Sequence, residues 1–158
     1  GITVDVGVAE PEVDHSLRAY FHHRATGMPY VVLKIATSLD GRIGCADGTS
    51  QWITKAAARQ DAHRLRADSQ AILVGCGTAL QDKPSLTVRL PGEPPKAQPL
   101  RVVLDSRGKV LEGPLLDTSV APTLIFTSKE HCSTEARAKW QASGVQTCDV
   151  PLASASNL

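Results

Sequence analysis

An almost continuous apolar run begins at Tyr30, within the stretch YVVLKIATSLDGRIG, and gives way to a polar loop at Ser38. A run of apolar residues without alternation is typical of a strand that is buried on both faces. In α/β proteins, ligands bind outside the carboxyl ends of such strands. We therefore expect residues 30–37 to form an interior strand whose following loop belongs to a binding site.

Two segments precede this run. Residues 2–8, ITVDVGV, alternate β-branched and polar residues, which predicts a half-buried or edge strand. From residue 10 to residue 25 the apolar spacing becomes three and four, which predicts a helix that Gly27 and Pro29 end. The predicted apolar face of this helix consists of Val13, Leu17, Tyr20 and Phe21.

The rest of the chain alternates between helices and strands. Asp47 and Gly48 predict a tight turn, and Thr54 is placed to cap a helix over residues 55–67. The succession of strand 30–37, helix 55–67 and strand 71–75 predicts two parallel strands joined by a right-handed crossover. The loops that follow these two strands are then expected to lie side by side. Further strands are expected at 71–75, 100–106, 123–128 and 144–150, with a helix at 134–141 and a proline-rich surface loop at 91–99.

Length and charge narrow the class of protein. The 158 residues, 42% of them hydrophobic, match one ordinary domain, which buries about 70% of its unfolded surface. A formal net charge of +1 excludes a globally basic surface for nucleic acid, so anion binding requires a local cluster of arginines. No apolar run approaches the roughly 20 residues of a membrane helix, and we expect neither a nucleic-acid nor a membrane partner.

Cysteine and histidine spacing predicts no metal site. The cysteines lack a Cys-x-x-Cys pair, and we expect free thiols in a reducing compartment. Adjacent on a helix, His22 and His23 point about 100° apart and cannot share one ion. His15 and His63 have no partner at ligand spacing, so a structural role is expected for both. The cysteines are Cys45, Cys76, Cys132 and Cys148.

Two strand ends carry candidate ligand loops. Residues 75–78, GCGT, allow a phosphate or nicotinamide to approach the backbone, but Leu80 occupies the third glycine position of the Rossmann fingerprint. A plain tight turn and a ligand loop therefore remain equally open. Later, Ser106 and Arg107 place a hydroxyl beside a guanidinium, which suits the 2′-phosphate of NADP; a solvated turn is the alternative.

Three cations are candidates for substrate binding. Arg66 and Arg89 are the pair best suited to a substrate phosphate, because a dianion needs fixed multidentate donors. Each of them alone is more often a surface residue. Lys34 lies inside the apolar run, where a lysine must either extend to solvent or face a ligand cavity.

Four motifs occur together and in order: YVVLKIATSLDGRIG, DGTSQWIT, LRADSQAILVGCGTALQDKPSLTVR and VVLDS. Together they closely resemble the reductase domain of the bifunctional riboflavin-biosynthesis deaminase/reductase, which is similar in fold to dihydrofolate reductase. The resemblance covers about Pro29 to at least Ser106. It implies an α/β fold with a mostly parallel sheet and flanking helices, incomplete at its C-terminus.

The activity that this resemblance implies is the NADPH-dependent reduction of the ribosyl group of 5-amino-6-(5-phosphoribosylamino)uracil to the ribityl group. Lys34 would act near the reacting ribose. The positions that match cofactor-binding residues of the family are Ala36, Trp52, Thr78, Asp82 and Ser106. The positions that match substrate-binding residues are Ser50, Arg66, Leu86 and Arg89.

The resemblance also implies a larger protein. Residues 1–27 resemble the close of a preceding deaminase domain with a linker helix, and residues 28–158 correspond to a reductase domain truncated before a Glu-Gly-Gly segment. We expect a homo-oligomer with a fused N-terminal deaminase, in the cytoplasm of a bacterium or the plastid stroma of a plant or alga.

Two alternative functions remain open at this point. A reductase-like half can serve only as a non-catalytic module that supports the folding or dimerisation of a fused deaminase. A reductase of a related pterin or sugar-phosphate substrate is the other alternative. NADPH titration addresses the first, and the choice of substrate that oxidises NADPH addresses the second.

Overall fold

The computed structural model describes residues 1–50, 52–92 and 97–151. The chain divides into two units, Gly1–Gln51 and Trp52–Leu158, each of which is described by itself. The middle of the proline-rich connection predicted at 91–99 lies outside the described residues. The boundary predicted after residue 27, between a deaminase end and a reductase domain, stays a prediction.

The first unit contains one helix, as its periodicity predicts. Helix α1 (Glu10–Thr26) has a proline in its first turn and acidic residues there, which favour the positive end of the helix dipole. Its end at Gly27 is confirmed, because that residue takes a left-handed φ of 69° and its N–H donates to the His23 carbonyl. The predicted apolar face is exposed within this unit.

Both strands predicted in the first unit are wrong. Residues 2–6 and 29–38 have no helix or strand, and the side chains of Val31 and Leu33 are 80% and 81% exposed. An apolar run reports a tendency toward burial, but a strand also needs a neighbour for its backbone hydrogen bonds. No such ladder forms within residues 1–50. The crossover predicted from residues 30–37 to residues 71–75 therefore lacks its first strand.

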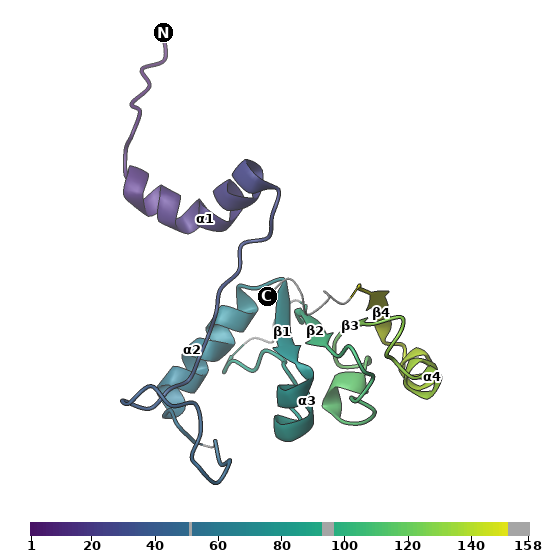
Figure 1. The fold of residues 1–158 in the computed structure, drawn as a ribbon. Coiled ribbons are helices and arrows are strands. Elements are labelled where there is room, and N and C mark those ends of the chain that lie inside the picture. Colours follow the sequence, from purple (N-terminus) through teal and green to yellow (C-terminus); the bar gives the residue numbers. More distant parts are fainter. Residues whose placement is uncertain (51, 93–96, 152–158) are drawn as a thin grey trace, which may run out of the picture. The chain divides into compact units, whose positions relative to one another are not determined.

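A parallel sheet forms the centre of the second unit (Figure 1). Within the described residues its strands are β1 (Ala71–Gly75), β2 (Leu100–Leu104), β3 (Thr123–Thr127) and β4 (Gln146–Asp149), in the order β1-β2-β3-β4. Every neighbouring pair is parallel. The strands predicted from Ala71 onward are thus confirmed, each ending within two residues of its predicted end.

Helices α2 (Ala56–Ala67), α3 (Cys76–Asp82) and α4 (Thr134–Ala142) belong to the same unit. The first and last confirm predicted helices, but Lys55 rather than Thr54 is the N-cap of α2 and makes no side-chain cap bond. Helix α3 replaces the loop or turn expected at residues 75–78, since β1 runs directly into it through Gly75.

The apolar core lies where α4 packs against the sheet. Val103 of β2 and Ile125 of β3 are paired in register and fully buried. Trp140 of α4 joins them, and its indole Nε1 donates to the Val110 carbonyl at 2.7 Å, so its polar atom is satisfied in the core. Gly108 is required nearby, because a Cβ there would lie 2.7 Å from Ala136 Cβ.

Arg101 is a buried cation that organises the connection between β2 and β3. Its Nη1 donates to the Pro114 carbonyl at 2.8 Å, and its Nη2 donates to the carbonyls of Asp117 at 2.8 Å and Ala121 at 2.6 Å. These acceptors follow or belong to a short 3-10 helix, Pro114–Leu116. One side chain thereby pairs three backbone groups of an irregular segment that has no ladder of its own.

Arg101→Met is expected to destabilise the protein by roughly 3–5 kcal/mol, because three carbonyls lose a charged donor while the stem volume is kept. Urea unfolding measures the change. The matched control is Arg64→Met, which removes an exposed arginine from α2 and should change the free energy of unfolding by less than about 0.5 kcal/mol. Equal effects of the two substitutions would contradict the assigned role.

Candidate functional site

Residues 87–89 are extended beside α2 without belonging to the sheet, and side chains supply their hydrogen bonds. Toward α2, the Thr87 carbonyl accepts from Arg66 Nη1 at 3.2 Å, and the Arg89 N–H donates to His63 Nδ1 at 3.1 Å. In the other direction, the Val88 N–H donates to Gln98 Oε1 at 2.7 Å, and Gln98 Nε2 donates to the Val88 carbonyl at 3.3 Å. The backbone alternates between its two sides as a strand does.

The approach to this segment is conformationally strained. Leu86 has a φ of 53° and Lys83 a φ of 41°, both in the left-handed region that non-glycine residues seldom adopt. The Leu86 side chain is only 5% exposed and packs into the apolar core. Its side chain therefore anchors the segment, and the substrate contact predicted for Leu86 stays a prediction.

The structure brings Arg66 and Arg89 together, as the phosphate hypothesis requires. Arg66 is half-buried, and burial followed by the charge of Arg89 lowers the pKa of its guanidinium. Among the described residues, no carboxylate forms an ion pair with either arginine. The pair is therefore a concentration of positive charge without an internal counter-ion.

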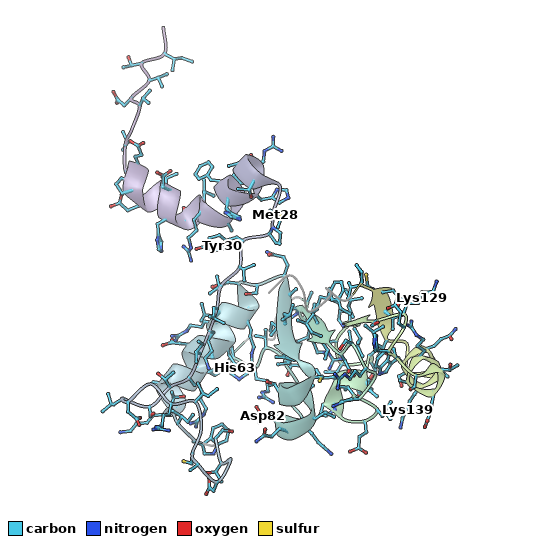
Figure 2. The ribbon with its side chains drawn as sticks, in the orientation of Figure 1. Met28, Tyr30, His63, Asp82, Lys129 and Lys139 are labelled. Carbon is cyan, nitrogen blue, oxygen red and sulfur yellow. The ribbon has the colours of Figure 1, made fainter. Side chains whose placement is uncertain are left out.

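His63 of α2, labelled in Figure 2, lies in this cluster, since it and Arg66 both bond to the backbone of residues 87–89. Burial lowers the pKa of His63, and the charges of Arg66 and Arg89 lower it further, against a smaller opposing effect of a hydrogen bond with the Thr87 backbone. The structural role predicted for this histidine from its lack of a metal-ligand partner overlooked its contact with Arg89. The three-residue spacing from Arg66 on a helix was the available signal.

The predicted cofactor residues of the second unit lie on exposed parts of several elements. Thr78 is exposed on α3, and Asp82, labelled in Figure 2, is the exposed last residue of that helix. Beside them, a Cβ placed on Gly75 or Gly77 would meet nothing within 4 Å, so a ligand can approach the backbone there. Trp52 is exposed, and the guanidinium of Arg59 lies over its ring at 4.4 Å from the centroid.

Ser106 follows β2 at the carboxyl edge of the sheet. It is partly exposed, and its carbonyl accepts from the Ser128 N–H at 3.3 Å, which ties together the turns after β2 and β3. Arg107 beside it is exposed. A hydroxyl and a guanidinium thus follow each other at an exposed strand end, and the 2′-phosphate contact predicted for them stays a prediction.

The remaining predicted residues belong to the first unit. Lys34 is exposed in a segment without secondary structure, and Ala36 and Ser50 are partly exposed. The expected strand environment of Lys34 is absent there, so its proposed direction toward a cavity stays a prediction. The turn predicted at Asp47 and Gly48 is confirmed, with the Gly48 N–H donating to the Cys45 carbonyl at 3.0 Å.

No group of three or more histidine, cysteine, aspartate or glutamate side chains is arranged to hold a metal ion in residues 1–50, 52–92 and 97–151. The same part of the chain contains no helix that combines the length and apolarity needed to cross a bilayer.

Comparison with known families decides the relationship of the chain. The family model of the RibD C-terminal domain matches residues 29–154. The chain belongs to this family. RibD of Chlamydia muridarum, a riboflavin biosynthesis protein, is 45% identical over 148 residues, which cover 92% of this chain and 40% of that protein. The chain thus spans about two fifths of such RibD relatives.

Solved structures agree with the RibD family. Acinetobacter baumannii RibD in its first crystal form superposes with a TM-score of 0.78 at 34% identity, over 96% of this chain and 42% of that one. A Thermotoga maritima protein described as a diaminohydroxyphosphoribosylaminopyrimidine deaminase/5-amino-6-(5-phosphoribosylamino)uracil reductase gives 0.73 at 32%, over 90% and 38%. The predicted mixed α/β class, dihydrofolate-reductase-like, is confirmed.

Gln98→Leu is expected to speed hydrogen exchange at the Val88 amide and to destabilise this RibD-family chain by about 2 kcal/mol, because two backbone groups lose their partner. Exchange followed by NMR or mass spectrometry measures the local effect. Gln98→Glu is the matched control: it keeps an acceptor for the Val88 N–H and should give an intermediate result. Unchanged exchange in Gln98→Leu would show that the segment is held otherwise.

Proposed function

We propose that this chain provides the reductase site of a RibD protein and reduces the ribosyl group of 5-amino-6-(5-phosphoribosylamino)uracil with NADPH. The observation that carries the proposal is the cluster of Arg66 and Arg89, which has no carboxylate partner within the described residues and lies where α2 bonds to the backbone of residues 87–89. Membership of the RibD family and the description of the Thermotoga relative support the same reaction. Catalysis in this proposal depends mainly on positioning.

A phosphate ester is the ligand that this cluster suits. Arg66 loses hydration through burial and is repelled by Arg89, so a dianion between them would offset both costs. Arginine donates from a rigid planar fork, which fixes a tetrahedral anion in orientation as well as in place. The phosphate would thereby hold the far end of the sugar while the ribose carbon reacts. Ser50 is assigned to the same phosphosugar.

The exposed residues of α3 and of the strand ends fit a nicotinamide dinucleotide. Open backbone at Gly75 and Gly77 permits close approach, Thr78 and Asp82 offer polar groups, and Ser106 with its neighbouring guanidinium suits a 2′-phosphate. Trp52 supplies an aromatic face and Ala36 a small side chain. When bound, the dihydronicotinamide would supply the hydride.

Lys34 is assigned to the reacting end of the sugar. Opening of the ribose ring gives an imine at its first carbon, and a lysine ammonium can donate a proton or a hydrogen bond there, which raises the electrophilicity of that carbon. The phosphate contacts of Arg66 and Arg89 would meanwhile keep the sugar from moving. Two functions, proton donation and anchoring, thus fall to different residues of the chain.

Arg66→Ala and Arg89→Ala are each expected to raise KM for the phosphoribosyl substrate by about 10- to 100-fold, because each removes charged hydrogen bonds to the phosphate. Steady-state NADPH oxidation by the full-length protein measures this. Arg64→Ala is the matched control, since Arg64 lies on the same helix but pairs with Asp61. If KM were unchanged in both test variants, the phosphate site would lie elsewhere.

Lys34→Ala should lower kcat by roughly 100-fold or more and leave KM nearly unchanged, as expected for loss of a general acid. Lys139→Ala, which removes an exposed lysine of α4, serves as the control and should leave both constants unchanged. Activity retained in Lys34→Ala would remove the catalytic assignment. Failure of the unmodified protein to bind NADPH at micromolar concentrations would instead favour a non-catalytic module.

A further inference from the structure

We infer that His63 is a positioning residue of the phosphate site: a neutral hydrogen-bond acceptor that holds the Arg89 backbone without adding charge. This inference rests on the proposed function, which assigns the substrate phosphate to Arg66 and Arg89. It goes beyond that function by naming what keeps the two guanidinium groups in place. The observation is that His63 accepts a hydrogen bond from the backbone N–H of Arg89, one of the two residues proposed to bind the phosphate.

The direction of this hydrogen bond fixes the chemical form of the ring. His63 Nδ1 lies 3.1 Å from the Arg89 nitrogen, which is a donor, so Nδ1 must be an acceptor without a proton. The neutral imidazole then carries its proton on Nε2. A protonated imidazolium has donors at both nitrogens and cannot accept this bond, so protonation of Nδ1 breaks the contact with the Arg89 N–H.

The cationic surroundings explain why a histidine serves at this position. The charged groups that act on the ring are Arg66 on its own helix and Arg89 on the facing segment, and both favour the neutral form. A carboxylate would also accept from the Arg89 N–H, but it would pair with the guanidinium groups and compete with the phosphate. Lysine or arginine would offer no acceptor and would add repulsion.

His63 and Arg66 together set the spacing of the site. They are three residues apart on α2, and they bond to the two backbone groups of residues 87–89 that face the helix. Because the Thr87 carbonyl is fixed by one and the Arg89 N–H by the other, the segment cannot slide along α2 without losing a hydrogen bond. Loss of the His63 contact would free the backbone at Arg89, and the position of the Arg89 guanidinium would then no longer be fixed.

Three substitutions separate the acceptor from the charge. His63→Asn keeps a neutral acceptor near the position of Nδ1, His63→Leu removes it, and His63→Asp keeps an acceptor but adds a negative charge. Sulfate is the probe, because its charge does not change near neutral pH, whereas a phosphate monoester titrates at about pH 6. Isothermal titration calorimetry of the full chain at pH 7 gives the dissociation constants.

We expect His63→Asn to bind sulfate within about threefold of the unmodified chain, and His63→Leu to bind about three- to tenfold more weakly. His63→Asp should bind most weakly of the three, by more than about tenfold, because its carboxylate competes for the guanidinium groups. The inference is overturned if His63→Leu binds as the unmodified chain does, or if His63→Asn is as weak as His63→Leu.

Arg66→Ala distinguishes failure of this inference from failure of the proposed site. If Arg66→Ala loses sulfate affinity while His63→Leu does not, the phosphate site stands and the positioning role falls. If the unmodified chain binds no sulfate, or if Arg66→Ala binds it unchanged, the phosphate site falls and the inference falls with it.

The imidazole nitrogens of His63 provide a test that needs no variant to fold. Nitrogen-15 chemical shifts of the unmodified chain at pH 7 should show a neutral ring with its proton on Nε2. As the pH falls below the ordinary range of histidine, the Arg89 amide resonance should shift together with protonation of Nδ1. A ring protonated at Nδ1 at pH 7 overturns the inference.

Discussion

The backbone of residues 87–89 is the constraint on which the candidate site depends. Its N–H and C=O groups need hydrogen-bond partners as those of a strand do, but within the described residues it belongs to no sheet. Its peptide groups must be paired once they are buried. Helix α2 meets this need on one side through His63 and Arg66, and Gln98 meets it on the other. Residues that hold the backbone therefore also determine where positive charge accumulates.

Most of the second unit follows from local sequence rules. Apolar runs from Ala71 onward become neighbouring parallel strands, since helices and loops of sufficient length connect them. Residues 30–37 obey the same local rule and yet form no strand. Hydrophobic pattern records only what a segment can bury, whereas pairing also requires a second backbone at the right distance. Local pattern could not supply that information.

The candidate site was predictable where residue chemistry alone decides and not where contacts decide. Arg66 and Arg89 were expected to act together because phosphate needs several fixed donors, and they do lie together. For His63 the sequence predicts only a structural role, because no metal-ligand partner lies near it in sequence, whereas in the structure its partner is the Arg89 backbone. A side chain that acts on a backbone group leaves no motif. Leu86 shows the converse, since its side chain belongs to the core.

The arginine cluster has no counter-ion within the described residues, so keeping it charged costs free energy, and this cost limits which side chains can lie beside it. Burial and repulsion by Arg89 both lower the pKa of Arg66, and both effects persist until an anion binds. A carboxylate would remove the cost by neutralising the cluster, but it would also remove the affinity for phosphate. Neutral groups can hold the backbone without neutralising the cluster. The His63 imidazole, whose pKa is lowered, and the Gln98 amide are such groups. The scaffold can therefore be rigid while its charge stays available to a ligand.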